Sequence, residues 1–262
     1  MNARFLSYVG FFVAVAGGSL SSSPSRAFGQ EAFESGGKPL VVAARGIGRY
    51  AQALGMRVEA PGKERLTISG TLVEDRGASQ VSLTYELSGA FRLDYQGGRT
   101  LGFDGDESWS RGRVLGANDR DLMEALSANS PEGFFSAIRS GSGMRRLGER
   151  FRADDGTTPN YAGPYFDVYQ LGGPVPHQGD DELRTRFFYF DSETGLLRRV
   201  RYLTRRQGAS KTIEVRFDDW LSASGDAIPQ HITVFYDDSK EFEFTATGAT
   251  FSTRADDGAF RQ

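Results

Sequence analysis

The stretch FFYFDSETGLL, residues Phe187–Leu197, decides the fold class of this chain. Its first half favours a β-strand, because four aromatic residues stand in succession. Its second half, Asp191–Gly195, is typical of a tight turn in which Gly195 is free to adopt a positive φ. Segments with apolar residues at alternate positions then continue to Phe251. The stretch therefore predicts one hairpin of a large antiparallel sheet.

The same period of two begins well before this stretch. Apolar residues recur at every second position from Leu66 to Phe103, and turn-forming clusters such as Gly97-Gly98 separate the runs. This is the period of a half-buried strand, and short connections make consecutive strands antiparallel neighbours. About ten strands are expected in all. An open sheet of that size curls or closes because its twist accumulates.

Between the two blocks of strands, the period changes to that of a helix. Residues 119–141 predict two helical pieces, the second of which begins after Pro131 with Ser130 as a fair N-cap. Two short helices cannot cover both faces of a large sheet, but they can fill the concave side of a curled one. The sequence thus predicts a mainly β (α+β) fold, a half-barrel with an internal helical plug or lid.

Residues 1–29 have the layout of a secretory signal peptide. Arg4 supplies the positive end, Phe5–Ala16 is nearly all apolar, and Ala27-Phe28-Gly29 places small residues before a cleavage site after Gly29. The apolar stretch is shorter than the ~20 residues of a membrane-spanning helix, so an uncleaved anchor is the weaker alternative. We expect an exported, periplasmic protein in which 30–262 form a single domain.

Composition argues against several classes of protein. Residues 30–262 contain 29 basic and 34 acidic residues, a formal charge of −5, and no basic block is dense enough for nucleic acid or an anionic membrane patch. The arginines of Arg198–Arg206 alternate with apolar residues and are interpreted as a solvated strand face. Cysteine is absent, so the hydrophobic core must stabilise the fold without disulfides. A bacterial lipobox also requires a cysteine, so we expect that the protein is not itself a lipoprotein.

Several of these motifs together resemble a known family. They are the segments Arg49–Gly55 (RYAQALG), Ile68–Gly70 (ISG), Tyr189–Arg198 (YFDSETGLLR), Val215–Trp220 (VRFDDW) and Gly225–Pro229 (GDAIP). They resemble the N-terminal helix, the first strand and the later turns of bacterial outer-membrane lipoprotein-sorting proteins, the LolA/LolB-like superfamily. In the last segment the Gly and Asp stand in the reverse of the family's order. The resemblance covers about Arg45 to Phe260.

The resemblance implies a half-barrel of about eleven strands around an N-terminal helix and internal helices, exported to the periplasm. In the carrier proteins of this superfamily an apolar cavity shelters lipoprotein acyl chains. Distant members also include periplasmic sensors, so the ligand does not follow from the fold. No cofactor or metal is implied, and a monomer is expected.

The candidates for a ligand-facing apolar wall come from three places. The predicted helices supply Leu122, Met123, Leu126, Phe134, Phe135 and Ile138. The predicted strands supply Phe91, Leu93, Phe188 and Phe190. Trp109 falls near a strand end, where the mouth of a carrier would be. Met and Phe suit an adaptable apolar wall. Ordinary core packing is the alternative for every one of them.

Other motifs have a simpler interpretation than the chemistry they suggest. Gly46–Ala51 matches GxGxxA, but no βαβ repeat follows it, so an amphipathic helix is favoured over a dinucleotide site. Asp104–Glu107 lacks the later ligands of a calcium loop and is interpreted as an acidic turn. The two histidines, His177 and His231, do not make a metal site, and no GxSxG elbow supports serine hydrolysis.

The sequence therefore favours a carrier or chaperone without catalysis, which binds lipid, lipoprotein acyl chains or another apolar ligand between the concave face and the helices of 119–141. The alternative is an envelope sensor or interaction protein that uses the same fold to bind a protein segment. The exposed sheet edges and the loop of residues 172–181 motivate that alternative. An enzyme remains a third possibility, which rests only on unassigned carboxylates.

Overall fold

The computed structural model describes Tyr50, Ala53 and residues 64–86, 88–104, 107–139, 144–152, 165–172, 185–206, 209–223, 226–253, 258 and 260, all within one compact unit, Gly37–Gln262. The expected signal peptide and the loop of 173–181 lie outside the described residues. Of the expected N-terminal helix, only Tyr50 and Ala53 are described, and both are helical.

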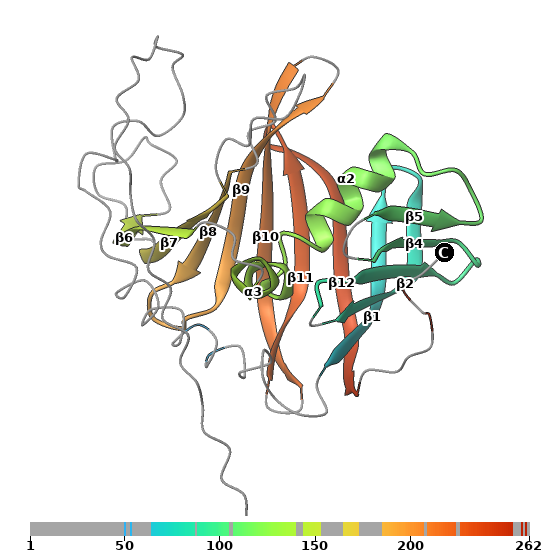
Figure 1. The fold of residues 1–262 in the computed structure, drawn as a ribbon, viewed down its shortest axis with the longest axis horizontal. Helices are drawn as coiled ribbons and strands as arrows, with labels where there is room; N and C mark the ends of the chain where they lie inside the picture. The colour runs from blue at the N-terminus through green and yellow to red at the C-terminus, as the bar shows by residue number, and fades with distance from the viewer. Residues whose placement is uncertain are drawn as a thin grey trace, which may run out of the picture. The chain divides into compact units, whose positions relative to one another are not determined.

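The described residues form a single antiparallel sheet of twelve strands (Figure 1). The strands are β1 Arg65–Glu74, β2 Gly77–Glu86, β3 Phe91–Tyr95, β4 Thr100–Phe103, β5 Ser108–Arg111, β6 Met144–Arg152, β7 Tyr165–Leu171, β8 Arg186–Asp191, β9 Leu197–Arg206, β10 Ala209–Ala223, β11 Asp226–Tyr236 and β12 Ser239–Ser252. Between β5 and β6 lie the two helices described in full, α2 Ala117–Leu126 and α3 Pro131–Arg139.

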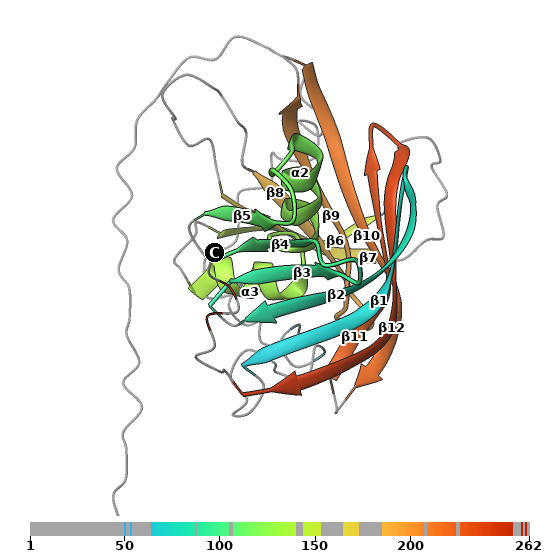
Figure 2. The same cartoon turned by 90° about the vertical axis from the view of Figure 1, so that its right-hand side faces the viewer.

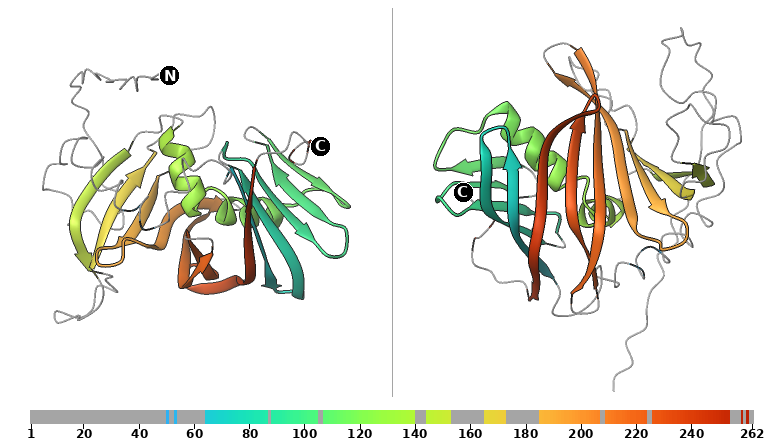
Figure 3. Two further views of the ribbon diagram at one scale, coloured as in Figure 1. Left: turned by 90° about the horizontal axis from the view of Figure 1, so that it is seen from below. Right: turned by 180° about the vertical axis from the view of Figure 1, so that it is seen from behind.

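The sheet is open and curled, as predicted. Its order is β5-β4-β3-β2-β1-β12-β11-β10-β9-β8-β7-β6, so the two blocks of strands join where β1 pairs with β12, and β5 and β6 are the edges. Seen from below, the sheet curves around α2 and α3, which lie on its concave side (Figure 3). The side view in Figure 2 shows the same arrangement. This is the expected half-barrel with helices inside.

The strand count exceeds the expectation because both edge strands lack an alternating apolar pattern. β5 reads SWSR and β6 reads MRRLGERFR. An edge strand contributes few side chains to the core, and charged residues there discourage pairing with other chains. The periodicity of the sequence therefore identifies the central strands and omits the two at the edges.

The turn predicted at Asp191–Gly195 is present between β8 and β9. The Asp191 side chain accepts hydrogen bonds from the amides of Glu193 and Thr194, at 2.9 and 2.8 Å. Gly195 has a φ of 75° and donates its amide to the Asp191 carbonyl at 2.8 Å. The hairpin predicted from Phe187–Leu197 is thus confirmed, and the Asp191 carboxylate stabilises its turn.

Glycine at position 70 is required by close packing at the junction of the two blocks. The register between β1 and β12 shifts between Ser69 and Gly70. A Cβ atom on Gly70 would lie 2.6 Å from the ring of Phe244 and would also meet the Thr245 carbonyl. Only a residue without a side chain allows this approach, which explains the glycine of the ISG motif.

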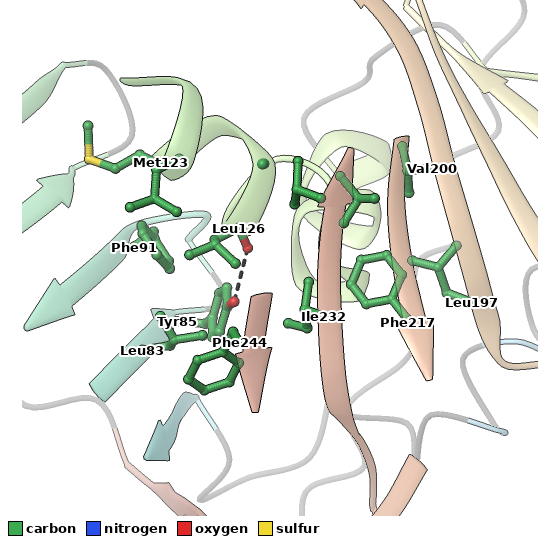
Figure 4. Close-up of a cluster of buried hydrophobic side chains, with 14 of the residues drawn as sticks. Leu83, Tyr85, Phe91, Met123, Leu126, Leu197, Val200, Phe217, Ile232 and Phe244 are labelled. Atoms are coloured by element: carbon green, nitrogen blue, oxygen red, sulfur yellow. Dashed lines mark hydrogen bonds between the residues drawn. The ribbon is translucent and has the colours of Figure 1, made fainter. Parts of the chain in front are cut away.

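One hydrophobic cluster fills the concave side of the sheet. It combines the inward-facing residues of both blocks with the apolar faces of the helices, and it includes Leu83, Tyr85, Phe91, Met123, Leu126, Leu197, Val200, Phe217, Ile232 and Phe244 (Figure 4). Both helices thus pack on the inner face of a sheet whose central strands direct alternate side chains to the inner and the outer face.

Among the described residues, no helix has the length and apolar character that crossing a membrane requires.

Candidate ligand-binding site

Helix α2 is held over the concave face by contacts to both blocks of strands. Leu122, Met123 and Leu126 are at most 2 % exposed. The Tyr85 hydroxyl of β2 donates a buried hydrogen bond of 2.9 Å to the Leu126 carbonyl (Figure 4). This bond satisfies one of the carbonyl groups that the end of a helix leaves without an intrahelical partner. The C-terminal end of α2 is therefore fixed to the first block of strands.

Ion pairs hold α2 at two further points. Near its N-terminus, Asp119 pairs with Arg99 and Arg113 and accepts a hydrogen bond from the Gly116 amide at 3.0 Å. Burial alone would raise the pKa of Asp119, but the Gly116 amide and the two guanidinium groups outweigh it and lower that pKa. On the opposite side, Glu124 pairs with Arg186 of β8 at 2.5 Å. Both blocks of the sheet therefore bind α2 through charged groups.

Helix α3 is held differently, by aromatic packing. Phe134 is fully buried, and its ring lies 4.8 Å from that of Phe188 and 4.9 Å from that of Phe190. Ser130 caps the helix as predicted, because its Oγ accepts the Gly133 amide at 3.0 Å. Burial of an aromatic residue of this size dominates the energetics of such a contact. Phe134 is therefore the anchor of α3 on β8.

A buried tyrosine extends this aromatic contact. The ring of Tyr50 stacks on Phe190 at 4.4 Å and meets Tyr169 edge-on at 5.6 Å. Its hydroxyl donates a hydrogen bond to the buried carboxylate of Asp167 on β7. Burial, together with this hydrogen bond, raises the pKa of Tyr50. Tyr50 therefore stays protonated and attaches the segment before β1 to the second block of strands.

The predicted wall residues are brought together, with one exception, in the hydrophobic cluster. Phe91, Leu93, Phe134, Phe188 and Phe190 are fully buried. Leu122, Met123, Leu126 and Phe135 are at most 6 % exposed, and Ile138 is partly buried against the same cluster. These side chains pack on one another. The packing itself is compatible both with an ordinary core and with a closed ligand site.

The exception is Trp109, which lies on the outer face of the sheet. It is paired across the strands with Gly102, whereas the core residue Leu101 is paired with Ser110. The Trp109 ring covers Gly102, where a Cβ atom would clash with it, and its Nε1 donates to the Phe260 carbonyl at 2.9 Å. Trp109 therefore contacts the C-terminal segment and not the interior.

A pocket of about 270 Å³ opens where α3 faces the hairpin between β2 and β3. Its walls include Tyr85 and Phe91 from the strands, Phe103 of β4, and Ser136 and Ala137 of α3. Phe91 is the member of the predicted wall that lines it. The pocket thus adjoins the buried cluster on one side and is open on the other.

Small residues bring α3 close to the hairpin and leave this pocket. Gly89 has a φ of 93°, and a Cβ atom there would lie 2.6 Å from Ser136 Oγ. Gly133 lies against the backbone of Ser127 and Ala128, with no room for a side chain. The sequence already indicated that one face of α3 can approach a neighbour closely, because Gly133, Ser136 and Ala137 share that face at i, i+3 and i+4.

Among the acidic and histidine residues in the described part of the chain, no group of three or more could hold a metal ion. His231 pairs with the exposed Asp219 at 2.8 Å. Asp104 accepts the amide of Glu107 at 2.9 Å, as expected of a turn. Gly105, Asp106 and His177 lie outside the described residues.

Two arginines of β9, Arg199 and Arg201, belong to an ion-pair network on the outer face. Glu214 of β10 pairs with Arg199 at 3.6 Å, Arg201 at 3.2 Å and Arg216 at 2.5 Å. The Arg199 guanidinium also lies 4.4 Å from the centre of the Tyr189 ring. Burial lowers the pKa of Arg199, and the Glu214 charge opposes this. These arginines thus stabilise strand pairing on the face away from α2 and α3.

No family model and no curated protein matches the chain. Similar solved structures include a LolA superfamily protein from Nitrosomonas europaea, with 7 % identity, a TM-score of 0.47, and coverage of 81 % of this chain and 97 % of that one. A putative outer membrane lipoprotein-sorting protein domain from Vibrio parahaemolyticus shows 13 % identity, a TM-score of 0.42, and coverage of 84 % and 97 %.

A third similar structure is that of MucB in complex with MucA(peri), with 11 % identity, a TM-score of 0.21, and coverage of 83 % and 95 %. Two of these proteins are named for the family that the sequence motifs resemble. Likeness at this distance does not assign a family, a ligand or a partner to this chain.

Proposed function

We propose that this protein is an exported binding protein without catalytic activity, which shelters a lipid acyl chain or another apolar ligand between the concave face and helix α3. The observation that supports the proposal most is the way α3 is held. Its anchor, Phe134, contacts the sheet through rings alone, so an apolar ligand can replace those contacts without leaving a charge unpaired.

The pocket beside Phe91 supplies the point of entry. At about 270 Å³ it lies just below the ~300–1,000 Å³ of sites that enclose a drug-sized ligand. It therefore accommodates the end of a chain. A longer chain displaces α3, and the wall is then formed by Phe91, Leu93, Phe188 and Phe190 on the strands. On the helices it is formed by Leu122, Met123, Leu126, Phe134, Phe135 and Ile138.

The energetics suit a carrier. An acyl chain gains about 0.8 kcal/mol for each CH₂ removed from water, so a chain of about 16 carbons gains on the order of 10 kcal/mol. A bilayer offers nearly the same gain. Uptake and release therefore depend on the small free-energy difference between the open and closed positions of α3.

The setting we propose is the periplasm, with cleavage after Gly29 and residues 30–262 acting as a monomeric domain. No cofactor takes part. The partners are lipid or lipoprotein acyl chains, together with a transient envelope protein. Trp109 has no place in this ligand site, since it contacts Phe260 on the outer face.

The proposal is tested with the protein lacking residues 1–29. Mass spectrometry of the purified protein should detect co-extracted lipid, and diphenylhexatriene, an uncharged apolar dye, should become fluorescent on binding. Phe134→Leu should alter dye affinity, whereas Val114→Ala, at a position 91 % exposed, should not. A lipid-free preparation that fails to take up the dye would contradict the proposal.

The second candidate function is the binding of a protein segment, and the burial of the predicted wall residues in one cluster favours it. Ten of the predicted wall residues are buried or partly buried in one hydrophobic cluster without a ligand. A protein that acts through its outer surface or its strand edges needs no cavity. A pull-down from envelope extract distinguishes the two functions, because this one predicts a stable protein partner and no exchange of lipid with membranes.

A further inference from the structure

The last described residue of the chain, Phe260, is bound to the outer face of the first block of strands. It is 7 % exposed. Its carbonyl accepts a buried hydrogen bond of 2.9 Å from Trp109 Nε1 on β5. Its ring lies against Arg65 of β1, whose guanidinium carbon is 5.2 Å from the ring centre. One residue that follows β12 thus contacts both ends of the strand series from β1 to β5.

The contact with Arg65 leads to the hairpin between β2 and β3, which forms one wall of the pocket. Arg65 is 12 % exposed and pairs with the buried carboxylate of Glu86 at 2.9 Å. That carboxylate also accepts the Ser88 hydroxyl at 3.3 Å, and the Glu86 carbonyl accepts the Gly89 amide at 2.9 Å. Glu86, Ser88 and Gly89 all line the pocket. The Phe260 ring therefore packs on the arginine that holds this hairpin.

The contact with Trp109 leads to β4, which supplies Phe103 to the lining of the pocket. The Trp109 ring lies over Gly102, where a Cβ atom would clash with it. Gly102 and Phe103 are consecutive, so they lie on opposite faces of the strand, and Phe103 packs against the inner cluster. Trp109, held by the Phe260 carbonyl, thus covers the backbone directly behind this part of the pocket wall.

The contact of Phe260 is independent of the strand ladders. Phe260 follows β12 and, in the described part of the chain, belongs to no strand of the sheet. Its release removes a buried ring, a cation–π contact and one hydrogen bond, but it leaves every pair of strands in place. Segments with few such contacts open at a lower free energy than the core beside them. Phe260 can therefore be bound or released while the sheet stays folded.

We propose that Phe260 is a strap that couples the outer face to the ligand pocket. While it is bound to Arg65 and Trp109, the β2–β3 hairpin and β4 keep the spacing that forms the pocket, and its release weakens ligand binding there. Coupling between two sites is reciprocal, so an apolar ligand in the pocket stabilises the bound strap in return. This inference rests on the proposed binding of apolar ligands and adds a means by which that binding is regulated.

The first test needs no ligand and uses hydrogen exchange followed by NMR. Phe260→Ala should speed the exchange of the Gly89 amide, which is bonded within the hairpin, and of the indole hydrogen of Trp109, which donates to the strap. The central strands β10 and β11 should keep their protection. Phe260→Leu, which keeps an apolar side chain, should show a smaller effect and serves if Phe260→Ala does not fold.

Phe235→Ala is the matched control. Phe235 also lies on the outer face, and the Arg216 guanidinium is 4.3 Å from its ring centre, but it belongs to β11 and does not line the pocket. The variant removes the same kind of ring-on-arginine contact from the second block of strands. It should leave the exchange of the Gly89 amide unchanged, and circular dichroism melts should show that every variant used is folded.

The second test measures the binding of 1-decanol, an uncharged apolar ligand, by isothermal titration calorimetry. Phe260→Ala should raise its Kd about fivefold or more, whereas Phe235→Ala should leave the Kd within about twofold of the parent. In the parent, saturating 1-decanol should slow the exchange of the Trp109 indole hydrogen, because the ligand stabilises the bound strap.

The outcomes separate the strap from the proposed function. If Phe260→Ala changed neither the exchange at Gly89 nor the Kd of 1-decanol, the strap would be overturned and the binding of apolar ligands would stand. Faster exchange with an unchanged Kd would also overturn the coupling to the pocket. If the parent bound neither 1-decanol nor diphenylhexatriene, the proposed function itself would be contradicted, and exchange at Gly89 would still decide whether Phe260 holds the hairpin.

Discussion

Helices α2 and α3 lie side by side on the same concave face, yet the sheet holds them by different forces. α2 is fixed by Asp119 and Glu124, whose arginine partners come from the two opposite blocks of strands. α3 is fixed by Phe134 and by small residues that allow close approach. Lifting α2 would leave the buried carboxylate of Asp119 unpaired, which is costly, whereas lifting Phe134 exposes apolar surface that a ligand can cover. From this difference we propose that α3, and not α2, moves when a ligand enters.

The largest effect is expected where α3 loses its anchor. Phe134→Ala removes a fully buried ring and should lower the free energy of unfolding by about 4 kcal/mol. Urea denaturation followed by circular dichroism measures the change. Val114→Ala, at an exposed position, should stay within about 0.5 kcal/mol of the parent. A loss below about 1 kcal/mol for Phe134→Ala would show that α3 is not held by this ring.

The next largest effect is expected at the ion pairs near the N-terminus of α2. Asp119→Asn keeps a capping oxygen but removes the charge between Arg99 and Arg113, so we expect a loss of about 3 kcal/mol at pH 7. The pKa of Asp119 is lowered in the folded protein. Its contribution is therefore complete above the unfolded value of about 3.9 and disappears as the pH falls through the folded value.

Urea denaturation between pH 7 and pH 2 checks this pH dependence. The difference between the parent and Asp119→Asn should be constant above about pH 5 and should shrink at lower pH. A difference that grows on acidification would mean that Asp119 is not the charged partner of the two arginines.

A smaller effect is expected at the other end of α2. Tyr85→Phe removes the hydroxyl that donates to the Leu126 carbonyl and keeps the ring, so the loss should be about 1–2 kcal/mol. Hydrogen exchange should become faster in the last turn of α2, while β2 keeps its protection. Faster exchange in α3 alone would contradict the assignment of this bond to α2.

The smallest effect is expected at the partly exposed pair of Glu124 and Arg186. Glu124→Gln should cost about 0.2–1 kcal/mol, because solvent screens the pair, and the cost should vanish in 1 M salt. Dye uptake should change less than it does with Phe134→Leu. If Glu124→Gln raised dye uptake strongly, α2 would have to be counted as part of the lid.

Local chemistry made several parts of this structure predictable. The alternation of apolar residues identified the ten inner strands, Asp191–Gly195 identified a turn, and Ser130 identified the start of α3. Each depends on neighbours within four residues in the sequence. The edge strands β5 and β6 could not be predicted in this way. A strand with only one neighbour needs few apolar residues, so these two strands lack the alternating pattern. The pocket was missed because Gly89 and Ser136 meet only after the chain has folded.

The residue pattern was sufficient to predict the class of fold and the apolar residues that share one face of each central strand. The period of two, the change of period at 119–141, and the turn residues are physical properties of short segments. The tertiary structure alone decided which face of each strand is concave, because alternation defines two faces without distinguishing them. The packing of α2 and α3 distinguishes them. It places Phe91 and Phe188 inside and Trp109 outside, and it brings Glu132 to the lining of the pocket.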